Sequence, residues 1–225
     1  MLERPFRDRA HAGHELAKLL RKYRHARPLV IGLPRGGVIV AFEIARELGA
    51  ELDVWIVRKV GAPAQPELGL GAVVEGGATY LDEDLAAEVG VAPDEMAKLV
   101  EEKEREVRER QRVYRGDAAR PEVAGRTVIV VDDGIATGAT VRAVLRAIAM
   151  RRPGRLVLAV PIASRDKLDE LRGLADDVVC AVPRDVLFSV GEAYLDFAQT
   201  DDEEVLDLLA RARARTPAPA ERSHP

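Results

Sequence analysis

The sequence predicts an α/β fold in which a parallel sheet is flanked by helices on both faces, with a small hood and an inserted charged helix. Two apolar runs, residues 28–33 (PLVIGL) and 127–132 (TVIVVD), are rich in β-branched residues and show no polar alternation. Strands of this kind are buried on both faces of a parallel sheet. Segments with helical spacing follow them, and this alternation requires helical crossovers. Aromatic residues make up only 4% of the chain, so the core must consist of Val, Leu, Ile and Ala.

The first part of the chain contributes a helix and then a strand–helix–strand unit. Residues 7–24 carry four apolar side chains at helical spacing, which predicts an amphipathic helix: Leu16, Leu19, Leu20 and Tyr23. After the strand 28–33 we expect a helix that ends at Gly49, because glycine commonly ends helices. The elements expected next are a buried strand (52–60), a Pro- and Gly-rich loop (61–71) and hairpin segments (71–81).

Residues 82–115 form a charged insertion with a narrow apolar stripe. The stripe consists of Met96, Leu99, Val100, Val107 and Tyr114. This pattern is typical of a solvated helix that packs on one side only. A role in subunit contact, and hence a homodimer, stays open as an alternative.

The rest of the chain repeats the strand–helix alternation. The expected elements are strands at 127–132, 155–161 and 177–182, with helices at 141–150 and 166–174. We therefore expect one domain over residues 1–212, with its core at about 28–182 and a hood at about 183–212, to which the N-terminal helix could belong. The Pro- and Ala-rich residues 213–225 predict a disordered tail.

The composition argues against several classes of protein. The net charge is −4 and the basic residues are scattered, so we expect no nucleic-acid partner. No apolar run approaches the roughly 20 residues of a membrane span, and residues 1–13 contain no signal-peptide core. We therefore expect a cytoplasmic protein without a membrane partner. The single cysteine, Cys180, excludes an internal disulfide, and the four histidines have no metal-ligand spacing.

Residues 128–140 (VIVVDDGIATGAT) predict a strand that ends in two carboxylates and opens into a turn of small residues. The small residues let the backbone approach a ligand closely, and the N–H groups of the helix that begins near Thr140 favour a phosphate. Asp132 and Asp133 would repel a phosphate but suit sugar hydroxyls, which donate hydrogen bonds to carboxylates. The combination predicts a site for a ribose 5-phosphate. The residues expected around the phosphate are Gly134, Ile135, Ala136, Thr137, Gly138, Ala139 and Thr140.

The stretch 128–140 resembles the phosphoribosyl pyrophosphate (PRPP) signature of the type I phosphoribosyltransferases. The resemblance implies the fold of that family, with Asp132 and Asp133 on the ribose 2′- and 3′-hydroxyls and the turn on the 5′-phosphate. It covers residues 28–200 and is strongest at 128–140. The overall pattern is most similar to a bacterial branch of the family whose substrate is unassigned. A Gly-rich turn with exposed acids is the structural alternative.

Two other loops resemble parts of the same family. LPRGG (33–37) is similar to its pyrophosphate loop, which implies pyrophosphate binding by Pro34, Arg35, Gly36 and Gly37 and a cis peptide bond before Arg35. Arg58 and Lys59 stand where the family has basic residues at the base of a mobile catalytic loop. They are candidate catalytic and pyrophosphate-binding residues at the mouth of the sheet, with the Pro- and Gly-rich stretch behind them as a lid.

The segment FSVGEAYLDF (188–197) distantly resembles the base-binding end of the 6-oxopurine enzymes. Phe188 could stack on a planar ring, while Tyr194 and Asp196 could approach its edge. The alternative is that these aromatic residues anchor the last helix in the core. Ala136 stands where the 6-oxopurine enzymes have an aspartate that acts on the purine. The acceptor therefore stays open among purine, pyrimidine and other bases.

The resemblance implies transfer of a 5-phosphoribosyl group from PRPP to a nitrogenous base, with Arg58, Lys59, Asp132 and Asp133 as the catalytic residues. Mg²⁺ would be the cofactor, held mainly by PRPP oxygens and water, with Asp132 and Asp133 acting indirectly. A PRPP-sensing regulator with little or no catalysis is the alternative. A PRPP-synthesising enzyme is a weaker one, because the sequence offers no recognisable ATP site.

Overall fold

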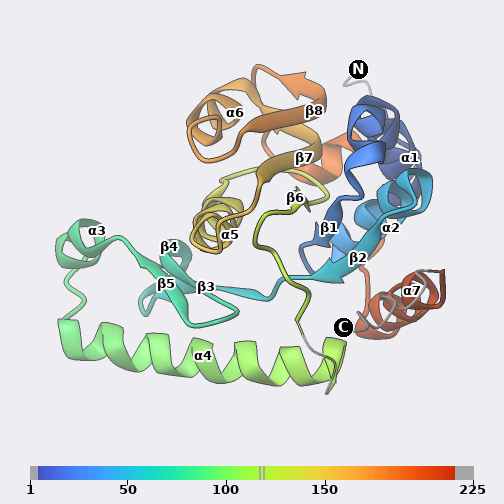
Figure 1. Ribbon diagram of the computed structural model, residues 1–225. Coiled ribbons are helices and arrows are strands. Elements are labelled where there is room, and N and C mark those ends of the chain that lie inside the picture. Colours follow the sequence, from blue (N-terminus) through green and yellow to red (C-terminus); the bar gives the residue numbers. More distant parts are fainter. Residues whose placement is uncertain (1–4, 117, 119, 216–225) are drawn as a thin grey trace, which may run out of the picture.

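The centre of the structure is a five-stranded parallel sheet with strand order β2-β1-β6-β7-β8. Figure 1 shows the computed structural model, which describes residues 5–116, 118 and 120–215. The strands are β1 (Leu29–Gly32), β2 (Glu51–Val54), β6 (Thr127–Val131), β7 (Arg155–Ser164) and β8 (Asp177–Arg184). The neighbours β1 and β6 are paired from Leu29–Val128 to Gly32–Val131, so both end at the same edge of the sheet. The predicted α/β fold is confirmed.

Helices cover both faces of this sheet (Figure 1). On one face lie α1 (Arg9–Leu20) and α2 (Gly36–Leu48), with α7 (Asp202–Arg215) packed against α2; on the other lie α5 (Ala139–Ala149) and α6 (Arg165–Leu171). Ile129 and Val131 of β6 face the first group of helices, while Val128 and Val130 face the second. All four are fully buried, which explains why the sequence of this strand shows no polar alternation.

The expected single strand 52–60 is wrong, because the chain changes sheets in its middle. After β2 ends at Val54, β3 (Val57–Ala62) begins a separate antiparallel sheet with β4 (Gln65–Val74) and β5 (Ala78–Leu81). The connection is fixed by Glu75, whose Oε2 accepts the N–H of Ile56 at 3.2 Å and whose own N–H donates to the Ile56 carbonyl at 2.8 Å. The expected loop 61–71 is also wrong, since only residues 63–64 separate β3 from β4. The hairpin at 71–81 is confirmed.

The charged insertion consists of α3 (Glu83–Glu88) and the long helix α4 (Pro93–Arg115). In Figure 1, α4 runs along the antiparallel sheet, and its last residue, Arg115, reaches β2 of the parallel sheet. Met96, Val107 and Tyr114 of the predicted stripe are buried, and Leu99 and Val100 are partly buried against the same cluster. The expectation of a helix packed on one side is confirmed.

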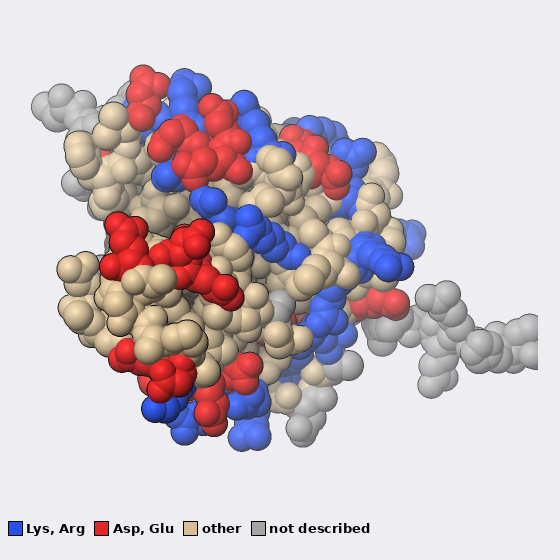
Figure 2. Space-filling model, turned by 90° about the vertical axis from the view of Figure 1, so that its left-hand side faces the viewer, with Lys and Arg blue, Asp and Glu red and all other residues tan. Residues whose placement is uncertain are grey.

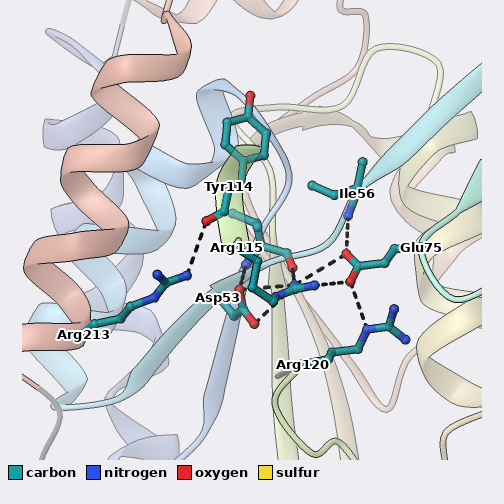
Figure 3. A network of polar contacts seen from close by, with 8 residues as sticks. Asp53, Ile56, Glu75, Tyr114, Arg115, Arg120 and Arg213 are labelled. Carbon is teal, nitrogen blue, oxygen red and sulfur yellow. Dashed lines mark hydrogen bonds and ion pairs between the residues drawn. The ribbon is translucent and has the colours of Figure 1, made fainter. Parts of the chain in front are cut away.

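A buried ionic network ties the end of α4 to both sheets (Figure 3). The Arg115 side chain is only 6% exposed; it forms ion pairs with Glu75 and, at 3.3 Å, with Asp53, and it donates to the Val54 carbonyl at 2.8 Å. Arg120 adds a 2.9 Å bond from Nε to Glu75. Burial alone would raise the pKa of Glu75, but the hydrogen bond and charge of Arg115 outweigh it, and that pKa is lowered. The network thus fixes the insertion relative to the core.

The segment before α1 joins the segment after β8. Phe6 and Tyr194 form an isolated parallel β-bridge, and the N–H of Leu195 donates to the Phe6 carbonyl at 2.9 Å. Helix α7 continues past the predicted boundary at 212 to Arg215, and residues 216–225 of the expected tail lie outside the described residues. Short 3₁₀ segments occur at η1 (Arg21–Ala26) and η2 (Val190–Ala193).

The surface carries charge of both signs. On the face shown in Figure 2, acidic and basic side chains form separate small groups among uncharged residues. None of the helices in the described part of the chain is long and apolar enough to cross a membrane.

Candidate active site

Two adjacent carboxylates lie at the carboxyl edge of the parallel sheet, directly after β6. Asp132 and Asp133 are half-buried, and Oδ1 of Asp132 accepts the backbone N–H of Asp133 at 2.9 Å. Burial, together with the charge of Asp133, raises the pKa of Asp132 well above its usual value. Burial also raises the pKa of Asp133, although Arg9 offsets part of that effect. The pair therefore favours hydrogen-bond donors or cations as ligands.

The turn after the acids leads into α5, which begins at Ala139, one residue before the expected start. Ile135 is buried and fixes the turn to β7 by donating its N–H to the Ile162 carbonyl at 2.9 Å. Ala136 and Thr137 are exposed, whereas Ala139 and Thr140 are half-buried. The N-cap residue is Gly138, with φ of 77°, and no side chain caps the helix there. The first N–H groups of α5 can therefore bind an anion.

The loop from Pro34 to Gly37 packs directly against the acid pair. The N–H of Leu33 donates to the Val131 carbonyl at 2.9 Å, and the Pro34–Arg35 peptide bond is cis, as the resemblance implies. A Cβ on Gly36 would overlap Oδ2 of Asp133, and one on Gly37 would lie 3.0 Å from Oδ1 of Asp132. Only glycine allows this close approach. The structure therefore brings together the loop 34–37 and the turn after β6, the two segments predicted to bind PRPP.

The positive charge of Arg35 in this loop acts on two side chains outside it, Tyr114 of α4 and Asp202 of α7. The pKa of Asp202 is lowered, mainly by the hydrogen bonds from Tyr114 and Arg110, with a smaller contribution from Arg35. Burial and the hydrogen bond to Asp202 still dominate at Tyr114 and raise its pKa to about 12. Tyr114 of the inserted helix α4 is thus within reach of the charge of Arg35 in the loop 34–37.

Arg9, at the start of α1, is a site residue that sequence reasoning missed. Its Nε lies 2.7 Å from Oδ2 of Asp133, and the two side chains are 11% and 17% exposed. Its Nη1 donates to the Ala198 carbonyl at 2.8 Å, and its guanidinium lies 3.8 Å from the centre of the Phe197 ring. Arg9 therefore connects the acid pair to the hood. In the sequence it is one of several arginines in a predicted amphipathic helix, so no local signal distinguishes it.

The hood residues divide into a buried and an exposed group. Tyr194 is 1% exposed, stacks on Phe197 with ring centres 5.0 Å apart, and donates its hydroxyl to the Asp133 carbonyl at 2.6 Å. Phe188 is 84% exposed, and Asp196 is also exposed, its carboxylate accepting the N–H of Ala198 at 3.0 Å. This placement favours the anchoring role for Tyr194 and leaves Phe188 accessible to a ligand.

The sequence predicts Arg58 and Lys59 at the end of a parallel strand, but they lie within β3 of the antiparallel sheet. Nε of Arg58 is 3.3 Å from Glu106 of α4, and its Nη1 donates to the Val57 carbonyl at 3.0 Å. Lys59 is paired with Ala72 of β4. The expectation failed because the chain leaves the parallel sheet before it reaches these residues.

The remaining candidate groups add no further chemistry. Burial raises the pKa of the Cys180 thiol to about 11, which fits a packing role and not a nucleophile. Within residues 5–116, 118 and 120–215, no three His, Cys, Asp or Glu side chains are grouped so that they could hold a metal ion.

Comparison with known proteins agrees with this geometry. The family model described as phosphoribosyl transferase domain matches residues 8–196. A Mycobacterium tuberculosis protein with the provisional name phosphoribosyl transferase, found in strains CDC 1551 and H37Rv, is 41% identical over 207 residues, which are 92% of this chain and 47% of that protein. The chain therefore spans about half the length of the curated relatives it matches. The crystal structure of TT1426 from Thermus thermophilus superposes with a TM-score of 0.76 at 43% identity, covering 92% of this chain and 98% of that one.

Proposed function

The chain belongs to the phosphoribosyl transferase domain family, and we propose that it transfers a 5-phosphoribosyl group from PRPP to a nitrogenous base and releases pyrophosphate. One observation carries the proposal. Asp132 and Asp133 lie at the end of β6 between the glycine loop 36–37 and the uncapped N-terminus of α5. Two carboxylates that can accept hydrogen bonds from a diol thus lie beside two groups of backbone donors suited to phosphates.

In the proposed complex, the two carboxylates accept hydrogen bonds from the ribose 2′- and 3′-hydroxyls. The N–H groups of the turn and of α5 bind the 5′-phosphate, with Thr137 and Thr140 as additional donors. The raised pKa values of both acids support this assignment, because hydroxyl donors stabilise the ionised carboxylates that burial disfavours. Arg35 and Gly36 lie where the pyrophosphate would leave.

The acid pair also suits Mg²⁺ bound mainly by PRPP. Two half-buried carboxylates with raised pKa values gain from a nearby cation, but they do not form a complete set of ligands. This arrangement fits an ion that keeps several waters and takes the rest of its ligands from substrate phosphates. Asp132 and Asp133 would contact its hydration shell, and the ion would neutralise charge on the pyrophosphate.

The reaction needs no covalent nucleophile from the protein. The bond between C1′ and the pyrophosphate oxygen breaks, a ring nitrogen of the base bonds to C1′, and the displaced proton of the base passes to solvent. Negative charge develops on the departing pyrophosphate, and Arg35 would stabilise it. Arg58 and Lys59 would contribute from β3, whose hairpin would have to approach the bound substrate.

The test is pyrophosphate release from PRPP with a panel of purine, pyrimidine and pyridine bases. We expect turnover with at least one base, and a loss of at least roughly tenfold in Asp133→Asn, about 1.4 kcal/mol of transition-state stabilisation. Asp169→Asn, an exposed acid on α6, is the matched control and should behave as wild type. Wild-type kinetics in Asp133→Asn would remove the diol role.

A second candidate function is PRPP sensing without transfer. It is favoured by the observation that Arg58 is engaged by Glu106 of the inserted helix rather than placed in a loop near the acids. Calorimetry separates the two functions, because a sensor binds PRPP but releases no pyrophosphate with any base of the panel.

A further inference from the structure

A cavity of about 650 Å³ lies at the C-terminal end of α5, the opposite end from the PRPP turn. Its walls come from that helix end, from the β4–β5 turn and from residues 120–124. The lining residues used below are Glu75, Gly76, Arg120, Glu122 and Arg151. The volume is within the range of roughly 300–1,000 Å³ that is typical of small-molecule sites.

Two arginine side chains converge on the same backbone position in this cavity. Gly76 has φ of 98°, and a Cβ added there would overlap Nη2 of Arg151 and lie 2.8 Å from Nη1 of Arg120. The two guanidinium groups therefore come close to each other over the β4–β5 turn. Both also lie over the ring of Trp55, at 5.3 Å for Arg120 and 5.7 Å for Arg151. Two cations held this close favour an anion between them.

The acids near the cavity balance the charge of the two arginines only in part. Glu75 is already shared between Arg115 and Arg120. Arg120 bonds Glu75 through Nε, and its two terminal nitrogens point away from Glu75 (Figure 3). Arg151 forms no ion pair within the described residues, and Glu122 is exposed to solvent. Within the described residues, no acid is thus paired with the donors of Arg151 or with the terminal donors of Arg120.

We propose that this cavity binds the phosphate group of a small phosphorylated molecule. A phosphate offers three acceptor oxygens and up to two negative charges, and guanidinium groups bind it through paired N–H donors. It can therefore bridge Arg120 and Arg151, whereas a single carboxylate carries only one charge for two cations. The site is separate from the proposed PRPP site, because the two lie at opposite ends of an 11-residue helix, roughly 16 Å apart along its axis.

The structure also provides a specific reporter, because Trp55 is the only tryptophan of the chain. Its side chain is 1% exposed and contacts both arginines through its ring. We would titrate the full chain with inorganic phosphate, pyrophosphate and AMP, and follow Trp55 emission and binding heat in parallel. The expected result is saturable binding tighter than about 1 mM for at least one probe, with a change in emission.

Three variants assign the site. Arg151→Gln should weaken binding at least tenfold. Arg155→Gln removes an exposed arginine that does not line the cavity, and Thr140→Val alters the PRPP turn; both should keep the emission titration of the wild type. Circular dichroism verifies that each variant is folded. The proposal is overturned if no probe binds, if Arg151→Gln binds like wild type, or if only Thr140→Val loses the titration, which would place the phosphate in the PRPP turn.

Discussion

Arg9→Ala is the substitution that tests most directly how the candidate site is held together. In the folded protein, Arg9 is the cation that faces Asp133, and it also bonds the Ala198 carbonyl and stacks on Phe197. Truncation removes all three contacts at once. Asp132 and Asp133 are then left without the positive charge of the Arg9 guanidinium, and the contacts through which Arg9 joins Asp133 to Ala198 and Phe197 of the hood are lost.

The size of the effect follows from burial. With side chains 11% and 17% exposed, the Arg9–Asp133 pair is closer to a buried ion pair than to a surface pair. Removing one partner of a buried pair costs about 3–5 kcal/mol, and the lost cation–π contact adds about 1 kcal/mol. Protonation of the abandoned acid pair recovers part of this. We therefore expect a loss of about 2–4 kcal/mol of unfolding free energy, or roughly 5–15 °C in Tm for a chain of this length.

Urea and thermal unfolding at pH 7 measure this loss. Arg7→Ala, an exposed arginine in the preceding segment, is the matched control and should stay within about 0.5 kcal/mol of wild type. In the Arg9→Ala, Asp133→Asn double variant, the loss should be smaller than the sum of the single losses, because the unpaired charge is gone. A single-variant loss under about 0.5 kcal/mol, or strict additivity, would refute the reasoning.

Three further predictions concern the acids, the ionic network and the hood. Because burial raises the pKa of Asp132 above its unfolded value, its ionisation destabilises the fold as pH rises through that raised pKa. In metal-free buffer, Asp132→Asn should therefore unfold at higher urea than wild type at pH 7, with the gap closing in acid. The hydrogen bond from Lys22 lowers the pKa of Asp177, so Asp177→Asn should unfold at lower urea than wild type at pH 7. A shift of the urea midpoint in the same direction as that of Asp132→Asn would contradict the assignment. Arg115→Met should lower the unfolding free energy by about 3–5 kcal/mol, whereas the control Arg112→Met, at an exposed position, should lower it by less than about 0.5 kcal/mol. Equal losses in the two variants would show that the network has no structural role. Phe188→Ala should leave the unfolding free energy unchanged but raise KM for the base by roughly tenfold, because stacking on a base typically contributes about 1–3 kcal/mol. A loss of stability would instead indicate that Phe188 belongs to the core.

The parallel sheet and the strand–turn–helix at 128–140 could be predicted from the sequence because their signals are local. The run 128–131 is apolar at every position, and both of its faces are covered by helices. The acids, glycines and hydroxyls of residues 132–140 follow that strand without interruption, so their position at the edge of the sheet follows from the position of the strand. Gly36 and Gly37 follow β1 in the same way, and β1 is the direct neighbour of β6.

The change of sheets after β2 could not be predicted, because its cause lies elsewhere in the chain. Residues 52–57 are almost entirely apolar, and nothing among them marks a break. The change of sheets is stabilised by Glu75, whose carboxylate accepts a hydrogen bond from the N–H of Ile56. The Pro- and Gly-rich segment 61–71, for which the sequence predicts a loop, forms strands for a similar reason. Residues 66–68 fall between the pairs Gly61–Gly69 and Ala62–Gln65, so an irregularity in the β3–β4 ladder accommodates Pro66.

The contact between Arg9 and Asp133 in the site also could not be predicted from the sequence, and this contact determines how ribose hydroxyls can bind the acid pair. It lies 124 positions from Asp133 in the sequence, so only the folded chain brings the two together. A carboxylate has two oxygens and about four acceptor positions, and Arg9 uses Oδ2 of Asp133 through a single N–H. Ribose hydroxyls can therefore bind the acid pair without displacing Arg9. On this reasoning Arg9 favours the ionised form of Asp133 and orients it for the sugar, so its removal should weaken PRPP binding, whereas a residue that blocked the site would strengthen binding when removed.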